Sequence, residues 1–96
     1  MARVVDVIGD YKIIRTSKDY IVINTKGEHR HHSHVKKEST ARLLIKLVTR
    51  KTMPRSDYLV EAARRITLDD KYRYELELKQ NKDKQRYINV NTGIRR

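Results

Sequence analysis

Residues 11–25 read YKIIR-TSKD-YIVINT, two runs of tyrosine, isoleucine and valine on either side of a polar loop. Aromatic and β-branched side chains favour extended backbone, and short polar loops of this kind close β-hairpins. The stretch therefore predicts an antiparallel pair of strands, residues 11–15 and 20–25.

The segments on either side of this hairpin extend the predicted sheet. Residues 3–8 (RVVDVI) are rich in valine and isoleucine, and Gly9 begins a turn into the next strand. Downstream, residues 26–28 make another turn, and residues 29–37 hold a single apolar side chain, Val35. We expect this last segment to form a loop or a short edge strand.

A helix is predicted next, because an N-cap residue precedes a one-sided apolar stripe. Ser39 or Thr40 can cap residues 41–51, and Pro54 prevents the helix from continuing. The apolar stripe repeats at helical spacing and comprises Ala41, Leu44, Ile45 and Val48.

A second helix follows at once. Ser56 is its N-cap, Asp57 lies in the first turn, where the helix dipole favours an acid, and the helix is expected to end near Ile66. Its apolar stripe comprises Leu59, Ala62, Ala63 and Ile66.

An alternating pattern in the C-terminal third predicts a second hairpin. Residues 72–79 alternate apolar and charged side chains with a period of two, which is typical of a strand with one buried face. Residues 81–84 would form the turn, residues 86–91 (RYINVN) the returning strand, and residues 92–96 a frayed basic tail. The apolar positions of the first strand are Tyr72, Tyr74, Leu76 and Leu78, and we expect core packing for the two tyrosines, although their spacing also suits base stacking.

These elements predict one α+β domain over residues 1–96, with the order βββ-αα-ββ and two helices packed on a small antiparallel sheet. A chain of 96 residues supports a single core, and its 6 tyrosines without phenylalanine or tryptophan leave isoleucine, leucine and valine to build it. Dimerisation often completes so small a core, so a homodimer is left open.

The positive charge of the chain is concentrated in its middle. Residues 29–55 hold eight lysines and arginines against one acid, Glu38, a net charge of +7 out of a total of +11. A local positive field attracts polyanions, of which nucleic acid is the most abundant in a cell. The charge distribution therefore predicts DNA or RNA as the partner, with an acidic protein or nucleoprotein surface as the alternative.

The predicted contacts lie on the first helix and around it. Arg42, Lys46 and Arg50 recur every fourth residue, so they line up along the helix at roughly 6 Å intervals and can follow a phosphate backbone. A solvated helix face is the alternative, but no acid stands between Ser39 and Arg55 to pair with them. The full set of predicted nucleic-acid contacts is Lys36, Lys37, Arg42, Lys46, Arg50, Lys51 and Arg55.

All four histidines of the chain fall within residues 29–34 (HRHHSH). In an extended segment His29 and His31 share one side while His32 and His34 share the other, so four ligands do not converge on one ion. We expect a solvated, metal-free loop that gains positive charge as the pH falls through about 6.5.

No pattern that carries catalytic chemistry is found. There are no cysteines and only 3 glycines, and the sequence holds no phosphate-binding loop, nucleophile elbow or metal-binding helix. Asp69 and Asp70, the only acidic doublet, suit a turn or a helix cap. We expect no enzyme activity and no cofactor. The N-terminal apolar run is broken at Asp6, so a cytoplasmic protein without a membrane segment is expected.

Two short tracts resemble known DNA-binding families. The pair of helices followed by a hairpin resembles the end of a winged helix-turn-helix domain, and residues 55–66 (RSDYLVEAARRI) resemble the second helix of ribbon-helix-helix repressors. In its overall character, a small chain rich in lysine, isoleucine, asparagine and tyrosine, the sequence is similar to accessory proteins of phages and prophages of Gram-positive bacteria.

The sequence therefore favours a small basic protein that binds nucleic acid through phosphates. The alternative is a phage-type interaction module that inhibits a host enzyme or nucleoprotein complex by docking on it. Phosphate binding weakens steeply with salt and an apolar protein interface does not, which separates the two.

Overall fold

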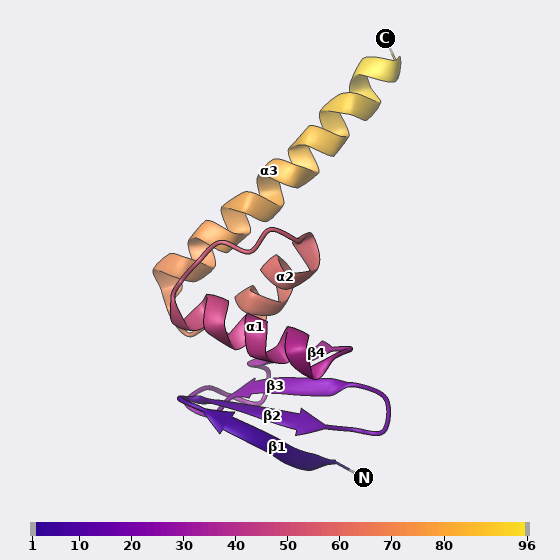
Figure 1. The fold of residues 1–96 in the computed structure, drawn as a ribbon. Coiled ribbons are helices and arrows are strands. Elements are labelled where there is room, and N and C mark those ends of the chain that lie inside the picture. Colours follow the sequence, from indigo (N-terminus) through magenta and orange to yellow (C-terminus); the bar gives the residue numbers. More distant parts are fainter. Residues whose placement is uncertain (1, 96) are drawn as a thin grey trace.

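The computed structural model describes residues 2–95, with side chains described for residues 2–82. Four strands are followed by three helices, so the order is ββββ-ααα, and all the helices lie on one side of the sheet (Figure 1). The elements are β1 (Arg3–Ile8), β2 (Tyr11–Arg15), β3 (Tyr20–Asn24), β4 (His32–Val35), α1 (Glu38–Thr49), α2 (Asp57–Ile66) and α3 (Asp70–Arg95).

The sheet is an antiparallel meander in the order β1-β2-β3-β4. The predicted hairpin of β2 and β3 is confirmed, and its loop is closed by Thr16, whose Oγ1 donates to the Asp19 carboxylate at 2.6 Å. The segment before the first helix forms the short edge strand β4, which was one of its two expected states. The register of β1 shifts between Val4 and Asp6.

Both predicted central helices are confirmed, with a correction at the start of the first. Helix α1 begins at Glu38 after Lys37, which makes no side-chain capping bond, so the predicted caps Ser39 and Thr40 lie inside the helix. Helix α2 begins as predicted, because the Ser56 hydroxyl accepts a hydrogen bond from the backbone N–H of Leu59 at 3.1 Å.

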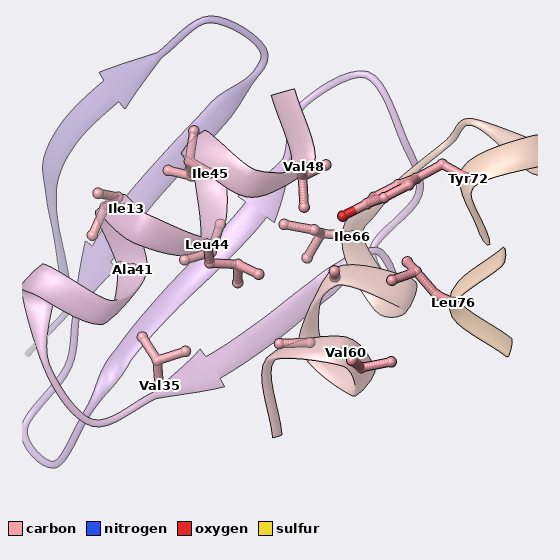
Figure 2. Close-up of a cluster of buried hydrophobic side chains, with 13 residues drawn as sticks. Ile13, Val35, Ala41, Leu44, Ile45, Val48, Val60, Ile66, Tyr72 and Leu76 are labelled. Atoms are coloured by element: carbon pink, nitrogen blue, oxygen red, sulfur yellow. The ribbon is translucent and has the colours of Figure 1, made fainter. Parts of the chain in front are cut away.

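One hydrophobic cluster joins the sheet to all three helices (Figure 2). Helix α2 lies in its centre, with the sheet on one side and α3 on the other. From α3, Tyr72 and Leu76 reach into the cluster and are almost completely buried. The cluster comprises Ile13, Val22, Val35, Ala41, Leu44, Ile45, Val48, Val60, Ala62, Ala63, Ile66, Tyr72 and Leu76.

Two buried polar side chains fasten the sheet to α2. The Asn24 amide of β3 donates to the carbonyl oxygen of Ile66 at 2.8 Å, and the Ser33 hydroxyl of β4 donates to that of Ala62 at 2.9 Å. The last carbonyls of a helix lack partners within the helix, so Asn24 satisfies a group that would otherwise be buried without a hydrogen bond.

The predicted C-terminal hairpin is wrong. Residues 70–95 form the single helix α3, so the strands at 72–79 and 86–91 and the turn at 81–84 do not exist. The backbone of residues 92–95, predicted as a frayed tail, continues the helix, and residue 96 lies outside the described residues. The resemblance to a winged domain is overturned with them, because no hairpin follows the helix pair.

Helical spacing explains the error. Tyr72 and Leu76 lie one helical turn apart and are buried, whereas Tyr74 and Leu78 are 61% and 41% exposed. A start signal is present as well, because the Asp69 carboxylate accepts from the backbone N–H of Tyr72 at 2.9 Å. The predicted cap within the acidic doublet is therefore confirmed. The leucines, glutamates and lysine of this tract also favour helix over strand.

In the part of the chain that is described, no helix combines the length and the apolar character needed to cross a bilayer.

We predict that Leu76→Ala destabilises the fold by about 2–5 kcal/mol, because it opens a cavity between α2 and α3. Leu78→Ala, two residues further along the exposed side of the helix, should change the free energy of unfolding by no more than about 0.5 kcal/mol. Urea denaturation of both variants gives the comparison. Equal losses would contradict the helix, since only a strand places both leucines on one face.

Candidate functional site

All seven predicted nucleic-acid contacts are exposed, but two of them are held in ion pairs. Arg42 donates to the carboxylate of Glu38, one turn earlier in α1, at 2.8 Å, and to that of Asp6 in β1 at 2.7 Å. The hydrogen bond that Arg42 donates to Glu38 is the largest cause that raises the pKa of Arg42, and the hydrogen bond that it donates to Asp6 is the largest cause that lowers the pKa of Asp6. Arg42 therefore ties α1 to the edge of the sheet.

Lys51 is the second paired residue. Its Nζ lies 2.7 Å from the carboxylate of Asp69, next to the start of α3. Lys51 follows the C-terminal end of α1, and its positive φ of 54° turns the chain away from the helix. The other five predicted contacts make no ion pair with any side chain among residues 2–82. These residues are Lys36, Lys37, Lys46, Arg50 and Arg55.

A shallow groove of about 230 Å³ separates α1 from β1 and brings the predicted stripe together. Its lining residues are Ile8, Arg42, Ile45, Lys46, Thr49 and Arg50. The predicted alignment of Arg42, Lys46 and Arg50 along the helix is therefore present. The charge of Arg42 is balanced by two carboxylates. Lys46 and Arg50 are therefore the residues of the groove whose positive charge is available to bind an external anion.

A second basic site, which the sequence did not reveal, is a pocket of about 310 Å³ between the β3–β4 loop, the end of α2 and the start of α3. No carboxylate lines it. The residues that line this arginine pocket are Arg30, His31, Arg64, Arg65 and Arg73.

Glu61 holds the two arginines that come from α2. Its carboxylate accepts from Arg64 at 2.7 Å and from Arg65 at 2.8 Å, and the amide of Gln80 in α3 donates to it at 2.6 Å. The hydrogen bond from Arg64 is the largest cause that lowers the pKa of Glu61 to about 2. The pair of guanidiniums is therefore fixed by a carboxylate that stays charged at any ordinary pH.

The other side of the pocket is held by α3 and the loop. Arg73 donates to the Asp70 carboxylate at 2.8 Å and to the carbonyl oxygen of Thr67 at 3.0 Å. In the loop, the Nδ1 atom of His31 accepts from the backbone N–H of Glu28 at 2.8 Å. A Cβ atom at Gly27 would lie 2.7 Å from that Nδ1, so the loop needs glycine to place His31 where it is.

The histidine tract is split between two sites. The rings of His29 and His32 are stacked with centroids 5.6 Å apart, and those of His32 and His34 in β4 meet edge to face at 5.3 Å, while His31 lines the arginine pocket. His29 and His34 are exposed, but His31 and His32 are half-buried. Among the residues whose side chains are described, no group of three potential ligands is placed to hold a metal ion.

Among residues 2–82, His34 is the one histidine with a carboxylate partner. Its Nδ1 lies 2.8 Å from the Asp19 carboxylate, and Tyr58 donates to its backbone carbonyl at 2.6 Å. Such a pair can orient a general base. However, the neighbouring hydroxyl of Ser33 points to the other face of β4 and is committed to Ala62, so the geometry does not make a nucleophile and base pair.

In the described part of the chain, no helix covers the face of the sheet opposite α1 and α2 (Figure 1). The strand register places branched side chains from β1, β2 and β3 together on this outer face, with Lys12, His32 and His34 among them. Val4 and Val7 are 52% and 55% exposed. The apolar members of the outer face are Val4, Val7, Ile14, Ile21 and Ile23.

Comparison with known proteins gives no assignment, since no family model, curated protein or solved structure matches the chain. The site is therefore interpreted from its own geometry.

We predict that the stabilising effect of Glu61 disappears in acid. Its pKa in the folded protein, about 2, lies below the usual 4.5, so the ionised form stabilises the fold above about pH 4.5 and this contribution is lost as the pH falls towards 2. Glu61→Gln should therefore be less stable than the wild type at pH 6, with a difference that shrinks at pH 3. Urea midpoints at both pH values measure it, and a pH-independent difference would contradict the ion pairs.

We also predict that the histidine tract does not bind zinc with submicromolar affinity. The Nδ1 atoms of His31, His32 and His34 are already engaged by Glu28, His29 and Asp19, and no three potential ligands among the described side chains are placed to hold one ion. Calorimetric titration with zinc at pH 7 tests this. Tight binding together with a raised melting temperature would show that the loop rearranges into a metal site.

Proposed function

We propose that the protein binds nucleic acid by contacting phosphates with the basic surface of α1. The proposal rests on five exposed cations of α1 and its flanks that have no carboxylate partner among residues 2–82. They are Lys36, Lys37, Lys46, Arg50 and Arg55. A surface that served only solubility would mix both signs of charge.

The geometry of α1 supports contacts along a strand. Lys46 and Arg50 stand about 6 Å apart, one helical turn from each other, beside the groove that faces β1. Lys36 and Lys37 lie before the first turn, at the opposite end of the helix. The four cations therefore span the length of α1, which suits a run of successive phosphates better than a single anion.

Recognition through phosphates alone carries no preference for sequence. The described part of the chain holds no helix with a set of amide or arginine side chains free of ion pairs and placed in the manner of a recognition helix, since the arginines of α2 are bound to Glu61. The proposed activity is therefore binding of DNA or RNA that depends on charge and is sensitive to salt.

The alternative function is docking on another protein, and the outer face of the sheet favours it. Its five branched side chains form an apolar surface of the kind that marks interaction sites. Binding through this face would persist at high salt, so the salt dependence of binding separates the two functions.

The test is a salt series with the variant Lys46→Gln/Arg50→Gln. If both side chains neutralise phosphates, the slope of log affinity against log salt should flatten by about 1.8 for duplex DNA, or by about 1.4 for a single strand. Arg42→Gln should change the slope much less, because its charge is already balanced by Glu38 and Asp6.

A matched control loses the same charge on the opposite side of the molecule. Lys12 lies on the outer face of the sheet and Lys18 in the β2–β3 loop, so Lys12→Gln/Lys18→Gln should leave the slope near that of the wild type. Equal flattening in both double variants would show a diffuse effect of net charge. Absence of DNA and RNA binding by the wild type at low salt would overturn the proposal and favour protein docking.

A further inference from the structure

The arginine pocket has the composition of an anion site, with three parts of the chain converging on it. Arg30 and His31 come from the β3–β4 loop, Arg64 and Arg65 from the last turn of α2, and Arg73 from the first turn of α3. A guanidinium presents a planar fork of donors that matches the oxygens of a phosphate. Four such forks line the pocket, and the carboxylates that pair with them are not part of its lining.

Donors remain available after the internal ion pairs are formed. Each guanidinium carries five N–H groups. The hydrogen bonds within the described residues use the Nε and Nη2 atoms of Arg64, only the Nε atom of Arg65, and the Nη1 and Nη2 atoms of Arg73. Glu61 therefore orients Arg64 and Arg65 while leaving most of the Arg65 fork for a ligand.

His31 adds a donor of defined direction. Because its Nδ1 accepts from the Glu28 backbone, the neutral ring carries its proton on Nε2. The ring lines the pocket, so a neutral His31 can donate to an anion without first taking up a proton.

The carboxylates around the pocket do not occupy it. Glu28 and Asp70, which pair with Arg30 and Arg73, have side chains 71% and 90% exposed, so water screens their charge. Glu61 is less exposed and is shared by two arginines, and Glu77 acts on Arg64 from α3. None of these four acids lines the pocket.

The size and the lining decide which anion fits. A volume of about 310 Å³ accommodates a phosphate group with part of its substituent, and the lining consists of four arginines and one histidine. A terminal phosphate offers the pocket three free oxygens and up to two negative charges. An internal phosphodiester offers two free oxygens and one charge, and its strand must leave the pocket in two directions.

We infer that the arginine pocket binds the terminal phosphate of a phosphomonoester, either at the end of a nucleic-acid strand or on a small molecule. The pocket is separate from the basic surface of α1 and stands without the proposed function, since no residue lines both sites.

The experiment compares two oligonucleotides of identical sequence, one with a 5′-phosphate and one with a 5′-hydroxyl, and adds inorganic phosphate and a nucleoside monophosphate as separate probes. Loss of charge-assisted hydrogen bonds is expected to cost about tenfold in affinity. Binding to a strand end predicts that the wild type prefers the 5′-phosphate strand by about that factor. Binding to a small molecule predicts that the monophosphate or inorganic phosphate binds while the two strands bind alike.

Variants assign either result to the pocket. Arg65→Gln/Arg73→Gln should abolish the preference for the phosphorylated probe, whereas Lys46→Gln/Arg50→Gln, with the same loss of charge, should keep that preference and flatten the salt slope. Gly27→Ala leaves the arginines intact and displaces His31, so it should weaken the preference even if the double arginine variant fails to fold.

The inference is overturned if no phosphorylated probe is preferred over its hydroxyl counterpart and inorganic phosphate does not bind. It is also overturned if the preference survives in Arg65→Gln/Arg73→Gln with the fold intact. If Lys46→Gln/Arg50→Gln keeps the salt slope of the wild type while a phosphorylated probe is preferred, only the proposal for α1 is contradicted. If that variant flattens the slope and no phosphorylated probe is preferred, only the inference about the pocket is contradicted.

Discussion

The hydrogen bond from the Asn24 amide to the carbonyl of Ile66, with its companion from Ser33 to Ala62, fixes how the helical layer sits on the sheet. Apolar contacts alone would let α2 slide, because they have no direction. Both polar side chains are buried, so any shift of α2 leaves them without partners at a cost of about 1–3 kcal/mol each. The last turn of α2 is thereby held beside the β3–β4 loop, and the arginine pocket forms where they meet.

The ion pairs divide the positive charge into a structural and an available part. The ion pair of Arg42 with Asp6 joins α1 to β1, and that of Lys51 with Asp69 joins the end of α1 to the start of α3. These two cations of the basic segment therefore stabilise the fold. The cations of α1 without partners, Lys46 and Arg50 among them, face outward. In the arginine pocket no carboxylate is part of the lining, and the pairing of Arg64 and Arg65 with Glu61 orients their donors and leaves part of them for a ligand.

The parts of the fold that can be predicted from the sequence are those whose residue pattern fits only one type of secondary structure. The β2–β3 hairpin and the helical period of α1 and α2 are of this kind, although the cap of α1 was misplaced and Val60, not the predicted Leu59, is fully buried in α2. Helix α3 is not, because four apolar side chains at alternate positions fit a strand, and only packing shows that two of them, Tyr74 and Leu78, stay exposed. The positions of the lysines and arginines along α1 could be predicted from the sequence. The ion pair of Arg42 with Asp6 and the arginine pocket could not, because the former joins residues 36 positions apart and the latter is built from three segments that only the tertiary fold brings together.

The most direct test of this account is an NMR titration of the ¹⁵N-labelled protein with a 5′-phosphorylated single strand at low salt. The account predicts two separate groups of shifted resonances, one from α1 around Lys46 and Arg50, and one from the pocket that includes the Nε groups of Arg65 and Arg73. Shifts confined to the outer face of the sheet, around Ile14 and Ile21, or no shifts at all, would contradict it.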